Sequence, residues 1–292
     1  MSAVQTPLVT WLYVPGDRPE RFAKAMASGA DAVILDLEDA VLPPVKDAAR
    51  RHVRDFLETR RAEPVGDGAR VHVRVNAPHS EWFALDAAAV AAGGADGVRV
   101  PKIESAEDVD LVVEAVGEGV PVDCLLESAR GVENVSEIAA HPAVRSLALG
   151  EADLTAELGL RGDEAFSWLR TRIVVASAAA GLAAPGMAAY IEVRDTEGLY
   201  RSCLRGRDIG LFGRTAIHPR QVPVIRRAFT PSEEEVSRAR QIAEAAECAS
   251  VGSARGGGAI ALADGRFIDA PVVTAALRTL ALAESIAERG AD

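Results

Sequence analysis

Two carboxylates, Glu127 and Asp153, each follow a short apolar run of the chain. If the two runs are neighbouring strands of a parallel barrel, both side chains lie at its carboxyl end. An oxygen-only pair suits a hard ion such as Mg²⁺ or Mn²⁺, with water and substrate oxygens completing the shell. Either acid alone could equally be a loop cap or a solvated residue, but together they favour a metal site. Gly150 and Gly159 flank Asp153 and could let a substrate approach the backbone.

A second group of charged residues also follows apolar runs: Arg74, and the acidic trio Asp36, Glu38 and Asp39. The Arg74 guanidinium could bind a carboxylate or stabilise an oxyanion, or form a salt bridge at the rim. Three acids so close together repel unless water, a metal or arginine compensates them. We expect them to hold metal-bound water or Arg74; the alternative is charge at a helix start. His218 precedes proline and is expected to be a structural hydrogen-bonder rather than a base.

Eight short apolar runs alternate with helix-like segments over about 230 residues, which predicts a closed parallel (β/α)8 TIM barrel over residues 1–230. In such a barrel the chemistry lies at the carboxyl ends of the strands. The runs are TWLYVP, AVILDLED, RVHVRVN, GVRVPK, VDCLLES, VRSLALGEAD, AAYIEV and LFGRTAIH.

Residues 231–292 are expected to form a C-terminal extension of helices and a hairpin. Ser232 and Glu235 have the spacing of a capping box before a helix that runs to about residue 247. A hairpin is predicted around Asp264-Gly265 and a last helix over 271–288. The extension is not needed to close a barrel core, so we expect a lid or a subunit-exchange element.

The composition narrows the class of protein. The chain has 292 residues, 49 % of them hydrophobic, and 32 basic against 43 acidic residues give a net charge of −11. This balance argues against nucleic acid as the main partner, although a locally basic pocket could still bind a small anion. We expect no signal segment and no membrane span. The three cysteines lack metal-type spacing and fit a reducing, cytoplasmic setting; Cys124 is expected in the core.

A set of motifs, in order and at consistent spacing, resembles the citrate lyase β-subunit-like family. This family belongs to the HpcH/HpaI aldolase/citrate lyase superfamily, and the resemblance is to its malyl-CoA and citramalyl-CoA lyase branch. It covers almost the whole chain, from Trp11 to the last helix. The motifs are VPGDRPERFAKA, GADAVILDLEDAV, Lys46 with AR at 49–50, RVN, VPKIESAED, LLESARGV, LALGEADLTAELG, AIHPRQ and DGRFIDAP.

The resemblance implies a TIM barrel that cleaves or forms a carbon–carbon bond beta to a thioester. It implies Mg²⁺ on Glu127 and Asp153, and contact of Arg74 with the reacting oxygens. We expect a lyase acting on a β-hydroxyacyl-CoA, with glyoxylate or pyruvate as the oxo-acid. The alternatives are a thioesterase using the same site, a class II pyruvate-type aldolase without a thioester, and a non-catalytic homologue with a binding or regulatory role.

The resemblance also implies partners and further site residues. Asp269 matches an aspartate that the family delivers to a neighbouring subunit, as the candidate general acid/base of a trimer or hexamer. Arg18 and Lys46 match positions that bind substrate phosphate or acid groups. Many relatives carry a proline–isoleucine–aspartate–glycine type sequence where this chain has Pro185-Gly186-Met187. With Met187 in place of that aspartate, we expect a different acyl group, a carrier-protein thioester or altered chemistry.

Overall fold

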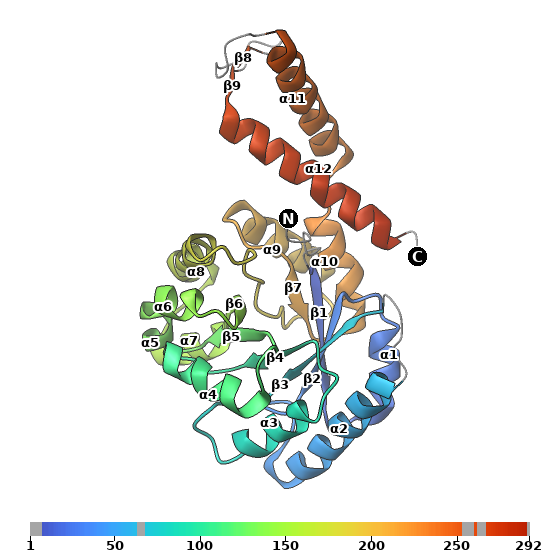
Figure 1. Ribbon diagram of the computed structural model, residues 1–292, viewed down its shortest axis with the longest axis vertical. Coiled ribbons are helices and arrows are strands. Elements are labelled where there is room, and N and C mark those ends of the chain that lie inside the picture. The colour runs from blue at the N-terminus through green and yellow to red at the C-terminus, as the bar shows by residue number, and fades with distance from the viewer. Residues whose placement is uncertain (1–7, 63–67, 253–259, 262–266, 291–292) are drawn as a thin grey trace. The chain divides into compact units, whose positions relative to one another are not determined.

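The computed structural model describes residues 8–62, 68–252, 260–261 and 267–290. The described residues up to Phe229 form one compact unit, and those from Thr230 onward form a second (Figure 1).

The first unit is built on a curled sheet of seven parallel strands, with helices on its outer side (Figure 1). The strand order is β6-β5-β4-β3-β2-β1-β7, so the first six strands pair in sequence order and β7 pairs with β1. The parallel α/β class predicted from the sequence is confirmed. The strands are β1 Thr10–Pro15, β2 Ala32–Asp36, β3 Arg70–Arg74, β4 Gly97–Val100, β5 Val122–Leu126, β6 Val144–Leu149 and β7 Arg214–Ala216.

The predicted strand AAYIEV, residues 188–193, is wrong. These residues have no strand assignment, and Ile191 is 76 % exposed. The apolar run was mistaken for a buried strand because its alternation alone does not say whether another strand lies beside it.

Gly186 and Met187, just before that run, lie between β6 and β7. Isolated parallel bridges join Ala148 to Gly186 and Met187 to Arg214. A sheet of seven strands with two single bridges therefore stands where an eight-stranded closed barrel was predicted. The difference is local: Pro185 has no N–H to donate to a ladder, so a longer strand is not favoured at this point.

Helices connect the strands and cover the outer face of the sheet. Ser105 caps α4 in a capping box with Asp108. Short 3-10 turns precede several helices, such as Pro19–Arg21 before α1. The helices of this unit are α1 Phe22–Met26, α2 Lys46–Ala62, α3 Phe83–Ala91, α4 Ala106–Val116, α5 Ala129–Glu133, α6 Val135–Ala140, α7 Glu151–Leu158, α8 Ser167–Ala179, α9 Thr196–Asp208 and α10 Val222–Phe229.

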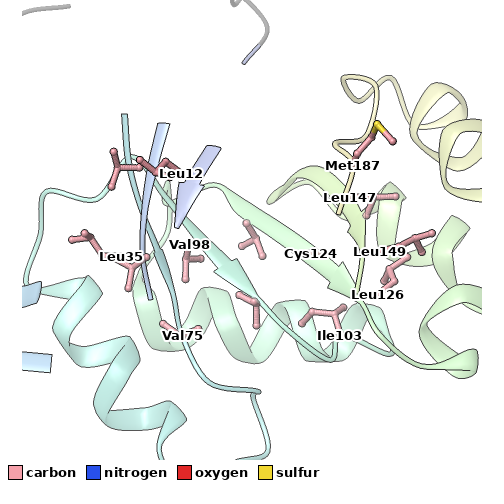
Figure 2. Packing of buried hydrophobic residues seen from close by; sticks show 14 of the residues in the cluster. Leu12, Leu35, Val75, Val98, Ile103, Cys124, Leu126, Leu147, Leu149 and Met187 are labelled. Carbon is pink, nitrogen blue, oxygen red and sulfur yellow. The ribbon is translucent and has the colours of Figure 1, made fainter. Parts of the chain in front are cut away.

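The hydrophobic core lies mainly between the sheet and these helices. Leu35, Val98 and Leu126 belong to one buried cluster that continues through the helix faces (Figure 2). Cys124 is buried in the same cluster, which confirms its predicted core position. Because side chains alternate along a strand, the residues between these point to the inside of the curled sheet. There they include charged groups.

The second unit contains the helices α11 Glu233–Gly252 and α12 Ala270–Gly290, which pack against each other, and a two-stranded antiparallel ladder of β8 Ile260–Ala261 and β9 Phe267–Ile268. Ser232 and Glu235 form the predicted capping box. The predicted turn at Asp264-Gly265 lies outside the described residues. Within the described chain, one window, Ala270–Ala287 of α12, is long and apolar enough to cross a membrane, which alone is weak support for a membrane segment.

Candidate active site

Arg74 is bound by the acidic trio that the sequence placed after β2. The register of β2 and β3 sets Asp36 opposite Arg74. Arg74 Nε and Nη2 donate to Asp36 Oδ1 and Oδ2 at 2.7 and 2.6 Å, and Nη1 donates to Asp39 Oδ2 at 3.3 Å. Glu38 Oε2 lies 2.6 Å from Nη1 but is not aligned as a hydrogen-bond acceptor. The sequence predicted that the trio holds either metal-bound water or Arg74, and the structure shows the contact with Arg74.

The Arg74 guanidinium has more N–H groups than the acidic trio accepts hydrogen bonds from. A guanidinium has five N–H groups, and the hydrogen bonds to Asp36 and Asp39 use three of them. Nη1 lies against both Asp39 and Glu38, but the second N–H of Nη2 has no acceptor among the described residues. Arg74 could therefore donate to a substrate oxygen without first breaking its contacts with the acids.

Glu127 and Asp153 come from adjacent strands, as predicted. Glu127 directly follows β5, and Asp153 lies in the first turn of α7, three residues beyond Gly150 at the end of β6. Asp153 is therefore at a helix start and exposed, whereas Glu127 is buried. Burial raises the pKa of Glu127 to about 8, and the charges of Glu38 and Asp153 add to this effect.

The surroundings of Glu127 fit a divalent cation. In the part of the chain that the structure describes, no hydrogen-bond donor contacts its buried carboxylate. Glu38, whose Oε2 is buried without an aligned donor, is close enough to raise the Glu127 pKa; its own pKa is raised to about 7, mainly by burial. No group of three or more Asp, Glu, His or Cys suited to a metal occurs among the described residues. The arrangement therefore suits an ion that takes few protein ligands and retains water, as Mg²⁺ does.

Lys102 is a residue of this site that the sequence did not single out. It follows β4, between the strands that carry Arg74 and Glu127, and its charge lowers the pKa of both Glu38 and Glu127. It is also the one residue other than glycine with positive φ, 55°, in the described chain. Such backbone conformations are costly and are concentrated at functional sites. The signal in the sequence was the lysine at the end of the run GVRVPK.

Lys46 does not offer its ammonium group to a substrate. Its Nζ atom is buried and donates to Leu37 O, Glu38 O and Asn76 Oδ1 at 2.7, 3.0 and 2.9 Å. These three acceptors use all three ammonium protons. Lys46 holds the backbone that carries Glu38, and its expected contact with a substrate phosphate or acid group stays a prediction.

The remaining predicted residues form other contacts. Arg18 is exposed on the short turn before α1, with Asp17 Oδ2 3.8 Å from its Nε. His218 accepts a hydrogen bond from the Arg220 backbone N–H through Nδ1, in line with the expected structural role. Asp269 is exposed in the second unit, where its carboxylate accepts from the Val272 N–H at 3.2 Å and caps α12.

Met187 does not face the carboxylates. It is 3 % exposed and belongs to the same buried hydrophobic cluster as Leu147 and Leu149 (Figure 2). A side chain on Gly206 of α9 would collide with its sulfur, so Met187 packs between the sheet and that helix. The side chain of Met187 thus points out of the curled sheet, and the expected effect of the missing aspartate on the acyl group or chemistry stays a prediction.

Residues 10–219, which carry all of this cluster, match the HpcH/HpaI aldolase/citrate lyase family. The chain belongs to this family. The resemblance to citrate lyase β-subunit-like proteins found in the sequence motifs is confirmed.

Two relatives are similar over nearly their full length. The chain is 38 % identical over 291 residues to a (3S)-malyl-CoA thioesterase of Cereibacter sphaeroides, covering 98 % of each chain. It is 38 % identical over 272 residues to a citrate lyase subunit beta-like protein of Mycobacterium tuberculosis, covering 90 % of this chain and 91 % of the relative.

A solved structure has the same fold. It is that of protein CitE from Mycobacterium tuberculosis in complex with magnesium, acetoacetate and coenzyme A. The TM-score is 0.78 at 36 % identity, over 94 % of this chain and 98 % of that one. Family membership therefore places the chain among enzymes named as citrate lyase β-like proteins and malyl-CoA thioesterases.

Proposed function

We propose that this protein is a Mg²⁺-dependent carbon–carbon lyase that cleaves or forms a β-hydroxyacyl-CoA of the malyl-CoA or citramalyl-CoA type. The observation that carries the proposal is the buried, donor-free carboxylate of Glu127 beside Asp153 and Arg74. The named relatives and the magnesium and coenzyme A complex of a protein with this fold support the substrate class.

Glu127 and Asp153 would hold the ion. When bound, Mg²⁺ supplies positive charge to the hydroxyl or keto oxygen and the carboxylate of the oxo-acid fragment. Arg74 adds fixed positive charge through its remaining Nη2 N–H group, and such contacts are typically worth a few kcal/mol. Lys102 adds a second cation at the same end of the sheet. Lys46 and Asp36 keep Glu38 and Arg74 in place.

Cleavage needs one proton removed and one supplied. A base takes the proton of the β-hydroxyl, the carbon–carbon bond breaks, and its electron pair moves into the thioester as an enolate. Protonation of the enolate carbon then gives the shorter acyl-CoA, while the other fragment leaves as glyoxylate or pyruvate. We assign this acid/base role to Asp269 of a neighbouring copy in a trimer or hexamer, an assignment that rests on the family resemblance.

Thioester hydrolysis is the second candidate, because the full-length relative at 38 % identity is named a malyl-CoA thioesterase. The same proton machinery could activate water to attack the thioester carbonyl, which releases malate and free CoA. An aldolase acting without a thioester and a homologue without activity have less support from the site.

The test is incubation with malyl-CoA and citramalyl-CoA, each with Mg²⁺ and with EDTA. The lyase predicts Mg²⁺-dependent glyoxylate or pyruvate in amounts equal to the acyl-CoA formed, and condensation of acetyl-CoA with the oxo-acid in reverse. Free thiol without oxo-acid would identify the hydrolase. Absence of turnover, condensation and calorimetric binding of Mg²⁺ or CoA would overturn both and favour a non-catalytic homologue.

A further inference from the structure

The inside of the curled sheet is polar beneath the carboxylate cluster. Tyr13 on β1, Arg74 on β3 and Arg99 on β4 share it, and the register sets Arg99 opposite Arg74. The interior of a barrel is more often filled by branched apolar residues. A tyrosine between two guanidinium groups therefore calls for a physical reason.

The Tyr13 ring covers a face of the Arg74 guanidinium. Arg74 Cζ lies 4.6 Å from the ring centroid, within the range of a cation–π contact. The edge of the same guanidinium is held by Asp36 and Asp39. Edge contacts alone leave the group free to tilt about the Asp36 carboxylate, and a ring against its face removes that freedom.

Arg99 lies near Tyr13. Burial raises the pKa of Tyr13, whereas the charges of Arg99 and Arg74 lower it, and Arg99 itself is 3 % exposed. Arg99 Nη1 donates to Thr215 Oγ1 at 3.2 Å, and Arg99 Cζ lies 5.7 Å from the Trp11 ring centroid. Among the described residues, no carboxylate forms an ion pair with Arg99, and its Nε has no partner.

We propose that Tyr13 is a positioning residue for Arg74: its ring fixes the plane of the guanidinium from inside the sheet. The kinetic consequence rests on the proposed function, because it is the remaining Arg74 N–H group that would meet the reacting oxygens. Small misplacements of such a group reduce turnover strongly.

Three variants distinguish the contribution of the Tyr13 ring from the contributions of its hydroxyl and of general packing. Tyr13→Phe keeps the ring, and Tyr13→Leu removes it at similar bulk. Ile34→Val trims a buried side chain of the same interior cluster and serves as the control. Each is assayed for kcat and KM with malyl-CoA and Mg²⁺, and for thermal unfolding. The hydrogen-exchange rate of the Arg74 Nε–H is followed by NMR, with the signal assigned through its loss in Arg74→Lys.

Tyr13→Leu should speed exchange at the Arg74 Nε–H and lower kcat about 2- to 30-fold, the range of one cation–π contact, with little change in KM. Tyr13→Phe and Ile34→Val should resemble the wild type. Unchanged exchange in Tyr13→Leu would overturn the proposal, as would equal losses in Tyr13→Phe and Tyr13→Leu. A wild type with no turnover would contradict the proposed function alone, because the exchange measurement still decides the role of Tyr13.

Discussion

The side chain of Glu127 occupies the space that a side chain on Gly150 would need. A Cβ atom on Gly150 would collide with Cγ, the carboxyl carbon and Oε1 of Glu127. Gly150 has φ −88°, which any residue tolerates, so its lack of a side chain and not its backbone conformation matters here. The glycine that the sequence suggested for substrate approach makes room for the buried carboxylate.

Gly150→Ala should therefore displace Glu127 while leaving the fold intact. We expect Mg²⁺ affinity to fall about 10- to 100-fold, as when groups that orient a metal ligand are altered. Isothermal titration with Mg²⁺ measures the loss, and far-UV circular dichroism checks the fold. Wild-type affinity in Gly150→Ala would show that Glu127 can bind from another rotamer or is not a ligand.

Removal of either carboxylate should abolish metal binding. Glu127→Ala or Asp153→Ala takes away one of only two protein ligands of an ion that already keeps several waters. Both variants should fold and lose Mg²⁺ binding and activity together, as followed by calorimetry and turnover. Asp39→Ala, which loses an exposed acid of the same charge, is the matched control and should keep the metal.

Without metal, stability should fall as pH rises. The pKa of Glu127 is raised from 4.5 to about 8 and that of Glu38 from 4.5 to about 7, so the folded protein binds more protons than the unfolded chain in this window. Stability is then highest below about pH 4.5 for these two groups and declines up to about pH 8. Urea unfolding in EDTA at several pH values measures the slope, which Glu127→Gln should reduce. Mg²⁺ affinity should rise over the same range.

Lys102 has an unfavourable positive φ, and its ammonium charge acts on Glu38 and Glu127. Lys102→Gly removes both and should stabilise the protein by up to about 1 kcal/mol while lowering kcat. Lys102→Met keeps the positive φ and removes the ammonium, so it should lose activity without gaining stability. Urea midpoints and steady-state kinetics separate the two effects. Full activity in both variants would leave Lys102 with no part in the reaction.

Asp269 should act in a neighbouring copy. Asp269→Asn is expected to fold and bind Mg²⁺ but lose most turnover, since a positioned acid/base contributes about 10²–10⁴-fold. Mixing it with inactive Glu127→Ala subunits should restore part of the activity, because some sites then receive one intact half from each chain. If subunit exchange is verified and the mixture stays inactive, Asp269 acts within its own chain or has no role in catalysis.

The sequence by itself determined the parallel α/β class and the positions that carry charge. All seven strands of the first unit lie within predicted apolar runs, because period and burial are encoded by residues adjacent in the chain. Three of these runs contain or precede Asp36, Arg74 and Glu127. The seventh predicted strand failed because its apolar residues had no strand beside them.

Only the tertiary structure decided what each charged side chain meets. Lys46 contacts Asn76, thirty residues away, and Arg74 contacts Asp36 across thirty-eight. Such pairs depend on the register of strands that are distant in sequence, and a shift of one residue would turn every side chain to the other face of the sheet. The outward direction of Met187 and the left-handed backbone of Lys102 have the same origin, since packing between elements rather than local preference fixes them.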